Sequence, residues 1–291
     1  MKAVLFVGHG SRDPEGNEQI RQFIQQILPK LPAELIVESC FLEFEQPDIA
    51  KGLDACVARG ATSVAVIPLM LLPAGHSKIH IPAAIDEAKK KYPSADFIYG
   101  KPIGIHHEAV EICKQRLQDT GEDTAHISED TAVIILGRGG SDPDANSDLY
   151  KITRLLWEKA PYPIMETAFV GVTVPSLEEA VEKTVKLGAK KVIILPYFLF
   201  TGILIKRIEG MIEQFRFAYS DVDFALAEYF GFHPKLELVI KDRIEEALSG
   251  AVYMNCDTCQ YRFEAMEHIS HHHHDHDHDH HHEPKGAETA Q

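Results

Sequence analysis

The sequence predicts an α/β protein with two duplicated halves, each built around a four-stranded parallel sheet, followed by a tail of different composition. Three observations lead to this fold class. Short apolar runs alternate with amphipathic helical patterns, as in parallel sheets joined by right-handed helical crossovers. Motifs of the first half recur in the second half in the same order. Residues 251–291 contain a dense stretch of histidine and aspartate.

Four apolar runs in the first half are expected to be strands. They are rich in β-branched or aromatic residues and show no polar alternation, which suits parallel strands covered on both faces. The four runs are residues 3–7, 35–41, 64–72 and 97–99.

Helical patterns lie between these runs. Apolar residues from Ile20 to Leu28 and from Ile49 to Val57 recur at helical spacing, and Gly60 supplies a stop for the second pattern. The second half repeats the order, with a helical pattern from Leu149 to Leu156 after its first strand. Each half is therefore read as four strand–helix units.

The internal repeat suggests the domain organisation. Residues 3–14 align with residues 132–143 at an offset of 129, and later matches such as Phe41 with Phe169 lie at an offset of 128. A slowly drifting offset between matched turn residues indicates duplication with small insertions or deletions. Three segments are expected: an N-terminal half at 1–121, a C-terminal half at 130–250 and a tail at 251–291.

Composition and charge exclude several classes of partner. The formal net charge is −15, so nucleic acid and anionic membrane surfaces are poor partners. The longest apolar run, residues 64–73, is too short for a membrane span. Five cysteines, three of them isolated, do not make a disulfide framework. Without a cleavage site after the first apolar segment, we expect a cytoplasmic protein.

Potential catalytic residues follow the strands of the first half. Ligands collect beyond the carboxyl ends of the strands in open parallel sheets, and these positions carry His9, Glu43 and His76. The second half has Arg138 in place of His9 and Leu204 in place of His76. Because the repeat keeps its structural residues but not these side chains, the first half is expected to be catalytic. The second half is expected to form a wall that carries a basic residue.

Four motifs carry a resemblance to a known family. VGHGSRDP, CFLEFEQP, IPLMLLPAGHSKIHIP and YGKPIG closely resemble the motifs of the sirohydrochlorin cobaltochelatases and ferrochelatases, which are class II chelatases. The resemblance covers about residues 1–250. It implies two flavodoxin-like halves with strand order 2-1-3-4 and a tetrapyrrole bound between them. It also implies that the chain inserts Co²⁺ into sirohydrochlorin in cobalamin biosynthesis.

The resemblance further assigns His9 and His76 to metal binding and Glu43 to metal or proton handling. Imidazole suits borderline ions such as Co²⁺, Fe²⁺ and Ni²⁺. Two neutral histidines and at most one carboxylate hold an ion while leaving positions for pyrrole nitrogens. The two pyrrole protons can pass to His9, His76 or Glu43. Polar and basic residues are candidates to bind the carboxylates of the ring, although a solvated surface charge is an equal alternative. They are Ser11, Arg12, Lys78, Lys101 and Arg138.

The tail carries two further motifs. Ten histidines interleaved with aspartates lie between His268 and His282. Such a composition cannot pack a core, so we expect a disordered reservoir for transition metal, with a purification tag as the alternative. Cys256 and Cys259 form a Cys-x-x-Cys pair that fits a redox pair, half a zinc site or part of an iron–sulfur site. The resemblance favours an iron–sulfur centre, which needs ligands beyond these two cysteines.

Other functions remain open at this point. A sirohydrochlorin ferrochelatase for sirohaem shares the same motifs. A metal storage or delivery protein without catalysis also carries histidine-rich tails, and a phosphate-ester enzyme could use the glycine-rich turns. The last has no identifiable nucleophile in this sequence. The sequence also leaves a homodimer open.

Overall fold

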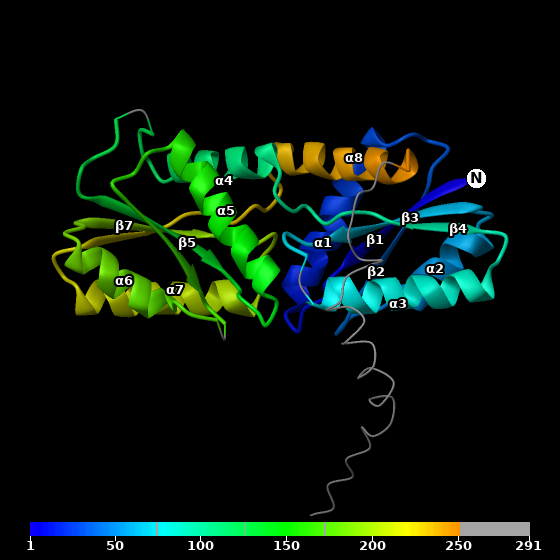
Figure 1. The fold of residues 1–291 in the computed structure, drawn as a ribbon, viewed down its shortest axis with the longest axis horizontal. Coiled ribbons are helices and arrows are strands. Elements are labelled where there is room, and N and C mark those ends of the chain that lie inside the picture. Colours follow the sequence, from blue (N-terminus) through cyan, green and yellow to red (C-terminus); the bar gives the residue numbers. More distant parts are fainter. Residues whose placement is uncertain (74, 125, 172, 251–291) are drawn as a thin grey trace, which may run out of the picture. The chain divides into compact units, whose positions relative to one another are not determined.

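Eight strands form two parallel sheets in the computed structural model (Figure 1). The structure describes residues 1–73, 75–124, 126–171 and 173–250, apart from the side chain of His76. The first sheet has the order β2-β1-β3-β4 and the second has the order β6-β5-β7-β8. The predicted fold class is therefore confirmed. The strands are β1 (Lys2–Gly8), β2 (Ile36–Phe41), β3 (Ser63–Leu69), β4 (Asp96–Tyr99), β5 (Thr131–Gly137), β6 (Ile164–Phe169), β7 (Lys191–Pro196) and β8 (Asp223–Leu226).

A helix follows each strand, and a short 3-10 helix, η1 (Leu28–Lys30), extends the first. No helix among the described residues is both long and apolar enough to span a membrane. The tail, with Cys256, Cys259 and the histidine-rich stretch, lies outside the described residues. The helices are α1 (Pro14–Ile27), α2 (Ile49–Ala58), α3 (Gly75–Lys91), α4 (His107–Asp119), α5 (Pro143–Lys159), α6 (Leu177–Lys186), α7 (Ile203–Ala218) and α8 (Pro234–Leu248).

The repeated Asp-Pro pair starts the first helix of each half. Asp13 caps α1 by accepting a hydrogen bond from the backbone N–H of Glu15, and Asp142 caps α5 by accepting one from Asp144. A proline at the first helical position loses nothing, because its missing N–H has no partner inside the helix. The two aspartates therefore fix where the chain turns back after β1 and β5.

One predicted strand is shorter than its apolar run. The run 64–72 predicts a strand to residue 72, but β3 ends at Leu69. Beyond it, the carbonyl groups of Met70 and Leu71 accept hydrogen bonds from the N–H groups of Ile103 and Gly104, in the loop after β4. The apolar side chains continue because they pack against the core, not because the strand continues.

Helices cover both faces of each sheet, so the central strands are fully buried. Residues 3–7 of β1 and 132–136 of β5 have no exposed surface. The outer faces pack against α2 and α3 in the first half and against α6 and α7 in the second. The remaining two faces share one continuous apolar cluster, to which α1, α4, α5 and α8 contribute.

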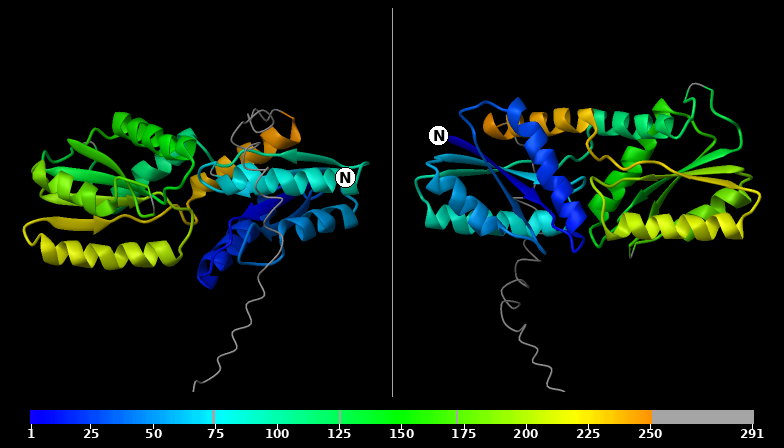
Figure 2. Two further views of the ribbon diagram at one scale, coloured as in Figure 1. Left: turned by 60° about the horizontal axis from the view of Figure 1, so that its bottom comes forward. Right: turned by 180° about the vertical axis from the view of Figure 1, so that it is seen from behind.

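The two halves exchange their last helices. Helix α4 follows β4 of the first sheet but packs against α5 and β7 of the second half, whereas α8 follows β8 but packs against β3 and β4 (Figures 1 and 2). The two helices also contact each other. Neither half is therefore closed by its own chain segment, and residues 1–250 belong to one compact unit.

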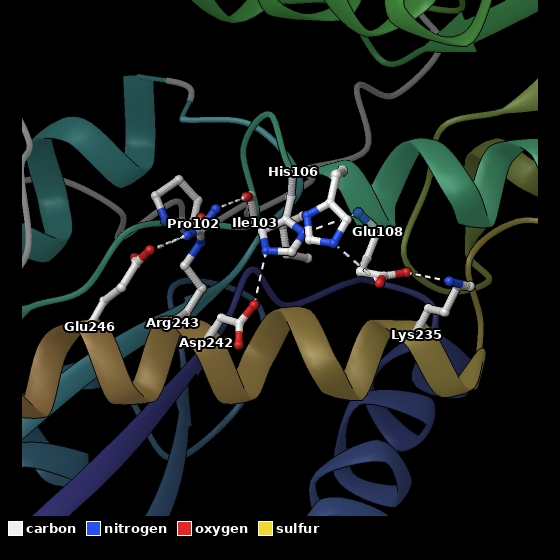
Figure 3. Close-up of polar contacts among 9 residues, drawn as sticks. Pro102, Ile103, His106, Glu108, Lys235, Asp242, Arg243 and Glu246 are labelled. Atoms are coloured by element: carbon white, nitrogen blue, oxygen red, sulfur yellow. Dashed lines mark hydrogen bonds and ion pairs between the residues drawn. The ribbon is translucent and has the colours of Figure 1, made fainter. Parts of the chain in front are cut away.

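Two equivalent arginines fasten the exchanged helices. Arg243 on α8 donates from Nε to the carbonyl oxygen of Pro102 (2.9 Å) and from Nη2 to that of Ile103 (2.7 Å), in the loop after β4 (Figure 3). Arg116 on α4 donates to the carbonyl oxygen of Phe230 (2.9 Å), in the loop after β8. Each arginine thus satisfies buried backbone acceptors of the half that its own helix covers.

Histidines cap both exchanged helices. His106 Nδ1 accepts a hydrogen bond from the N–H of Glu108 (3.2 Å), so Nε2 carries the ring proton and donates to Asp242 on α8 (3.2 Å). His233 Nδ1 accepts in the same way from the N–H of Lys235. An ion pair between Glu108 and Lys235 joins the two helix starts (Figure 3).

Candidate active site

His9 and Glu43 lie side by side at the carboxyl edge of the first sheet. His9 follows β1 and Glu43 follows the neighbouring β2. Backbone pairing continues past both strand ends, because the N–H of Glu43 donates to the carbonyl oxygen of His9 (3.1 Å). The His9 Nδ1 atom lies 3.4 Å from Glu43 Oε1, and the side chains are 32% and 28% exposed. The pair is thus held by the sheet yet open to a ligand.

A glycine permits this close approach of the two loops. Gly10 has a φ of +86°, and a Cβ atom there would lie 1.7 Å from the carbonyl oxygen of Glu43. In the second half the crowding is reversed, since a Cβ on Gly171 would lie 2.4 Å from the carbonyl oxygen of Arg138. Each half therefore needs glycine on one of the two facing loops.

Arg138 meets His9 from the opposite half. It follows β5, and its Nη1 atom lies 3.2 Å from His9 Nε2. A guanidinium group can only donate, so Nε2 must be the accepting, unprotonated nitrogen. The ring proton is then on Nδ1, which faces the carbonyl oxygen of Gly10 (3.1 Å) and Glu43 Oε1. The contact fixes the tautomer of His9, with the lone pair directed towards the second half.

His76, the third predicted ligand, belongs to the first turn of α3, which follows the neighbouring strand β3. Its side chain lies outside the described residues. Among the side chains that are described, no three histidine, cysteine or acidic residues gather as a metal site. The described part of the predicted site is therefore the pair of His9 and Glu43.

Lys78, a predicted ring-binding residue, forms an ion pair between the halves. Its Nζ atom lies 2.7 Å from Asp142 at the start of α5, and the side chain is only 11% exposed. Burial lowers the pKa of Lys78, but the hydrogen bond and charge of Asp142 outweigh burial and raise it overall. The equivalent pair joins Lys206 on α7 to Asp13 (2.7 Å), where the hydrogen bond from Lys206 lowers the pKa of Asp13. Two equivalent ion pairs thus hold the facing sheet edges together.

Ser11 and Lys101, two further predicted ring-binding residues, differ in their surroundings. Ser11 shapes the turn before α1, because its Oγ accepts from the N–H of Asp13 (3.0 Å) and its N–H donates to Asn17 Oδ1 (2.8 Å). Lys101 is half-buried and follows β4, at the edge of the sheet away from β2.

Arg12 and Phe44 form an exposed pair beside Glu43. The Arg12 guanidinium lies 4.9 Å from the centre of the Phe44 ring. Phe44 is 55% exposed and has a φ of +61°, a backbone conformation that large side chains rarely adopt. Phe44 thus lies exposed beside Glu43, in a backbone conformation of the kind that clusters at functional sites.

Sequence analysis missed two residues of this region. Lys206 could have been found from the repeat, because it stands 128 positions after Lys78 just as Asp142 stands 129 after Asp13. Phe44 gave no signal, because an aromatic residue in the stretch CFLEFEQP is equally compatible with a buried strand end.

Comparison with known proteins gives consistent matches. The family model described as CbiX matches residues 3–120 and 132–247. A sirohydrochlorin cobaltochelatase of Priestia megaterium is 66% identical over 272 residues, which cover 94% of this chain and 88% of the relative. A sirohydrochlorin ferrochelatase of the same organism is 37% identical over 249 residues, covering 86% of this chain and 91% of the relative.

Solved structures with a similar fold carry metal ions. SirB from Bacillus subtilis with Fe³⁺ superposes with a TM-score of 0.76 at 34% identity, covering 86% of this chain and 96% of that protein. The sirohydrochlorin chelatase SirB from Bacillus subtilis subspecies spizizenii, in complex with cobalt, gives a TM-score of 0.72 at 33% identity. That match covers 84% of this chain and 94% of the other.

Proposed function

The chain belongs to the CbiX family, and from this premise we propose that it is a metal chelatase that inserts Co²⁺ into sirohydrochlorin, a tetrapyrrole. One structural observation carries the proposal. His9 and Glu43 share the carboxyl edge of one sheet, and the lone pair of His9 Nε2 is directed at the opposite half. The 66% identity to a sirohydrochlorin cobaltochelatase indicates sirohydrochlorin as the ring and Co²⁺ as the metal.

The histidines deliver the ion in this scheme. A neutral imidazole binds a divalent ion through a ring nitrogen, and the other nitrogen commonly donates its proton to a backbone carbonyl or a carboxylate. His9 has this arrangement, with Nε2 as the binding nitrogen and Gly10 and Glu43 facing Nδ1. His76 is the second ligand. With so few protein ligands, pyrrole nitrogens can enter the coordination shell and draw the ion into the ring.

The pyrrole protons need acceptors next to the ion. Glu43 is partly exposed and lies 3.4 Å from His9 Nδ1, so a proton released at the ring can pass to the carboxylate directly or to a histidine that has given up the metal. Both kinds of acceptor lie within one site, and insertion does not require a distant base.

The ring is held by the exposed cations and the aromatic side chain around this pair. Arg12 and Arg138 bind ring carboxylates, because guanidinium groups match carboxylates in two-point hydrogen bonds. The exposed face of Phe44 packs against the macrocycle. Lys78 serves mainly as a clamp between the halves, since Asp142 already pairs with its charge. Ser11 supports the turn that carries Arg12, and Lys101 is a more distant candidate for the rim.

The tail supplies metal to the site. The histidine-rich stretch from His268 to His282 collects transition metal by many weak imidazole sites and raises its concentration near the ring. The iron–sulfur interpretation of Cys256 and Cys259, and the homodimer, stay predictions from the sequence. Iron analysis of the purified protein tests for the iron–sulfur centre, and its molecular mass in solution tests for the homodimer.

A second candidate function has one observation in its favour. The 37% identity to a sirohydrochlorin ferrochelatase makes Fe²⁺ the alternative metal, and imidazole ligands alone do not separate the two ions. Metal storage without catalysis does not account for the pairing of His9 with Glu43 opposite an arginine.

The experiment is anaerobic incubation of the full chain with sirohydrochlorin and Co²⁺, Fe²⁺ or Ni²⁺ in turn, followed by absorbance. We expect the ring spectrum to change fastest with Co²⁺ and the change to require His9. A faster rate with Fe²⁺ would favour the ferrochelatase. Metal binding without any change in the ring spectrum would leave storage as the function.

A further inference from the structure

Arg138 forms a hydrogen bond with Nε2 of His9, the nitrogen through which His9 would bind a metal ion. Its Nη1 atom donates to Nε2 at 3.2 Å, and Nε2 is the nitrogen whose lone pair is available in this tautomer. The other nitrogen carries the proton and faces Gly10 and Glu43. A guanidinium group and a metal ion cannot use one lone pair at the same time, and the two positive charges repel each other. Arg138 must therefore move before His9 can bind an ion through Nε2.

Arg138 is also free to serve a second ligand. Among the described residues, no carboxylate forms an ion pair with it, and its side chain is exposed. The two lysines that join the halves differ in this respect, because Asp142 pairs with Lys78 and Asp13 with Lys206. A long, exposed cation with only a neutral acceptor in its described contacts gains from exchanging that acceptor for a carboxylate, because the carboxylate adds an opposite charge and can accept two parallel hydrogen bonds from one guanidinium group.

We propose that Arg138 is a guanidinium gate over His9: it closes the metal-binding nitrogen in the empty protein and moves to a carboxylate of the tetrapyrrole when the ring binds. The inference rests on the proposed function, because it takes the ring as the source of the carboxylate. Ring binding then opens His9, so the ring enters first and the ion is accepted where it can be inserted. The duplication explains how the gate arose, since Arg138 occupies in the second half the position of His9 in the first.

The test measures Co²⁺ binding to the full chain without the ring. Four proteins are titrated with Co²⁺: the unchanged chain, Arg138→Ala, His9→Ala and the double variant. Subtracting each His9→Ala isotherm from its partner isolates the binding that depends on His9, because the tail is the same in both. We expect the His9-dependent binding of Arg138→Ala to have its midpoint at about tenfold lower free Co²⁺, the effect of removing one charge-assisted hydrogen bond. Equal midpoints would overturn the gate.

Arg12→Ala is the matched control, because it removes an exposed arginine of the same rim that stacks on Phe44. We expect it to leave the midpoint unchanged, and an equal shift would mean that any lost positive charge explains the result. In the insertion assay at saturating ring, Arg138→Ala should leave the KM for Co²⁺ unchanged, because the bound ring has already opened the gate, and it should raise the KM for the ring. Insertion by the unchanged chain together with equal cobalt midpoints would refute the gate alone. Absence of insertion with every metal would refute the proposed function, while the isotherms would still report on the contact.

Discussion

Arg138 Nη1 lies 3.2 Å from His9 Nε2, and these two residues hold equivalent positions in the two duplicated halves. Contact between equivalent positions means that the carboxyl ends of β1 and β5 face each other. The ion pair between Glu108 and Lys235 joins equivalent positions as well. The halves therefore meet with near two-fold symmetry, and chemistry can be asymmetric only through side-chain identity. At the site the difference is an imidazole on one side and a guanidinium on the other.

The first prediction concerns the described pair of the site. His9→Ala should lower the insertion rate at least 100-fold, because it removes a proposed metal ligand and a proton acceptor together. The melting temperature should stay unchanged, since His9 lies outside the apolar core and is partly exposed. Insertion is followed by absorbance and unfolding by calorimetry.

The control for that substitution is His126→Ala, which removes a well-exposed histidine that forms an ion pair with Asp123, three residues before it in the chain. It should change neither rate nor stability. Glu43→Gln should slow insertion about tenfold or more, because the amide cannot accept a proton although it keeps the size of the side chain. Near-normal turnover of either site variant would remove that residue from the assignment.

The second prediction concerns the clamp between the halves. Asp142→Asn should lower the free energy of unfolding by about 1–3 kcal/mol, because it removes the nearer carboxylate from the mostly buried ammonium of Lys78 and leaves only Asp144, which is largely exposed and lies 3.4 Å away. Urea unfolding measures the effect. Glu87→Gln, which breaks the exposed pair with Lys90, should cost no more than the error of the measurement. A similar loss for both variants would mean that the buried pair has no special role in joining the halves.

The strands could be predicted from sequence because a strand buried on both faces is an apolar run without polar alternation. The runs beginning at residues 3 and 64 contain no alternation, and both are central strands. The helix exchange could not be predicted, because the amphipathic pattern of α4 only requires an apolar partner. Any sheet satisfies that requirement. The exchange depends on long-range contacts such as that of Arg243 with Pro102 and Ile103.

The candidate site could likewise be predicted from the sequence only in part. The neighbourhood of His9 and Glu43 follows from strand order, since both residues come directly after adjacent strands. The partner of Lys78 depended on which loops of the second half face α3, and a local motif does not encode that. The left-handed backbone of Phe44 lies in a bend of the chain beside Glu43, and the sequence has no glycine at that position to indicate it.

The third prediction concerns pH and the exchanged helices. Burial, together with the positive charges of Arg243 and His107, lowers the pKa of His106 from its ordinary value of 6.5, although Asp242 opposes the shift. Burial and Arg116 lower the pKa of His233 in the same direction. The unfolded chain therefore binds these protons more readily than the folded protein. Their contribution to stability is complete above about pH 6.5 and is lost as the pH falls through the lowered pKa values.

Urea unfolding at pH 7 and pH 5 tests this dependence. The unchanged chain should be less stable at pH 5, in part because a proton on Nδ1 removes the acceptor that caps α4 or α8. His106→Asn keeps a side-chain acceptor at the cap but does not titrate in this range. It should show a smaller loss of stability between the two pH values. The same pH dependence in both proteins would mean that the cap does not titrate.

The fourth prediction separates the tail from the site. Truncation after Gly250 removes Cys256, Cys259 and the ten clustered histidines but none of the strand-end residues. With plentiful Co²⁺ the shortened chain should insert the metal at the rate of the full chain, because His9, Glu43 and His76 are retained. When free Co²⁺ is scarce it should fall behind, because a tethered cluster of weak sites keeps ions near the ring.

Insertion rates over a range of buffered Co²⁺ concentrations measure this difference. Equal rates of the two proteins at every concentration would mean that the tail does not deliver metal to the site. Loss of activity at saturating Co²⁺ would have the opposite meaning: the tail, through Cys256 and Cys259 or its histidines, would belong to the catalytic machinery. A full chain with both cysteines replaced by serine distinguishes those two sources. It keeps the histidine stretch, so a loss that it reproduces comes from the cysteines.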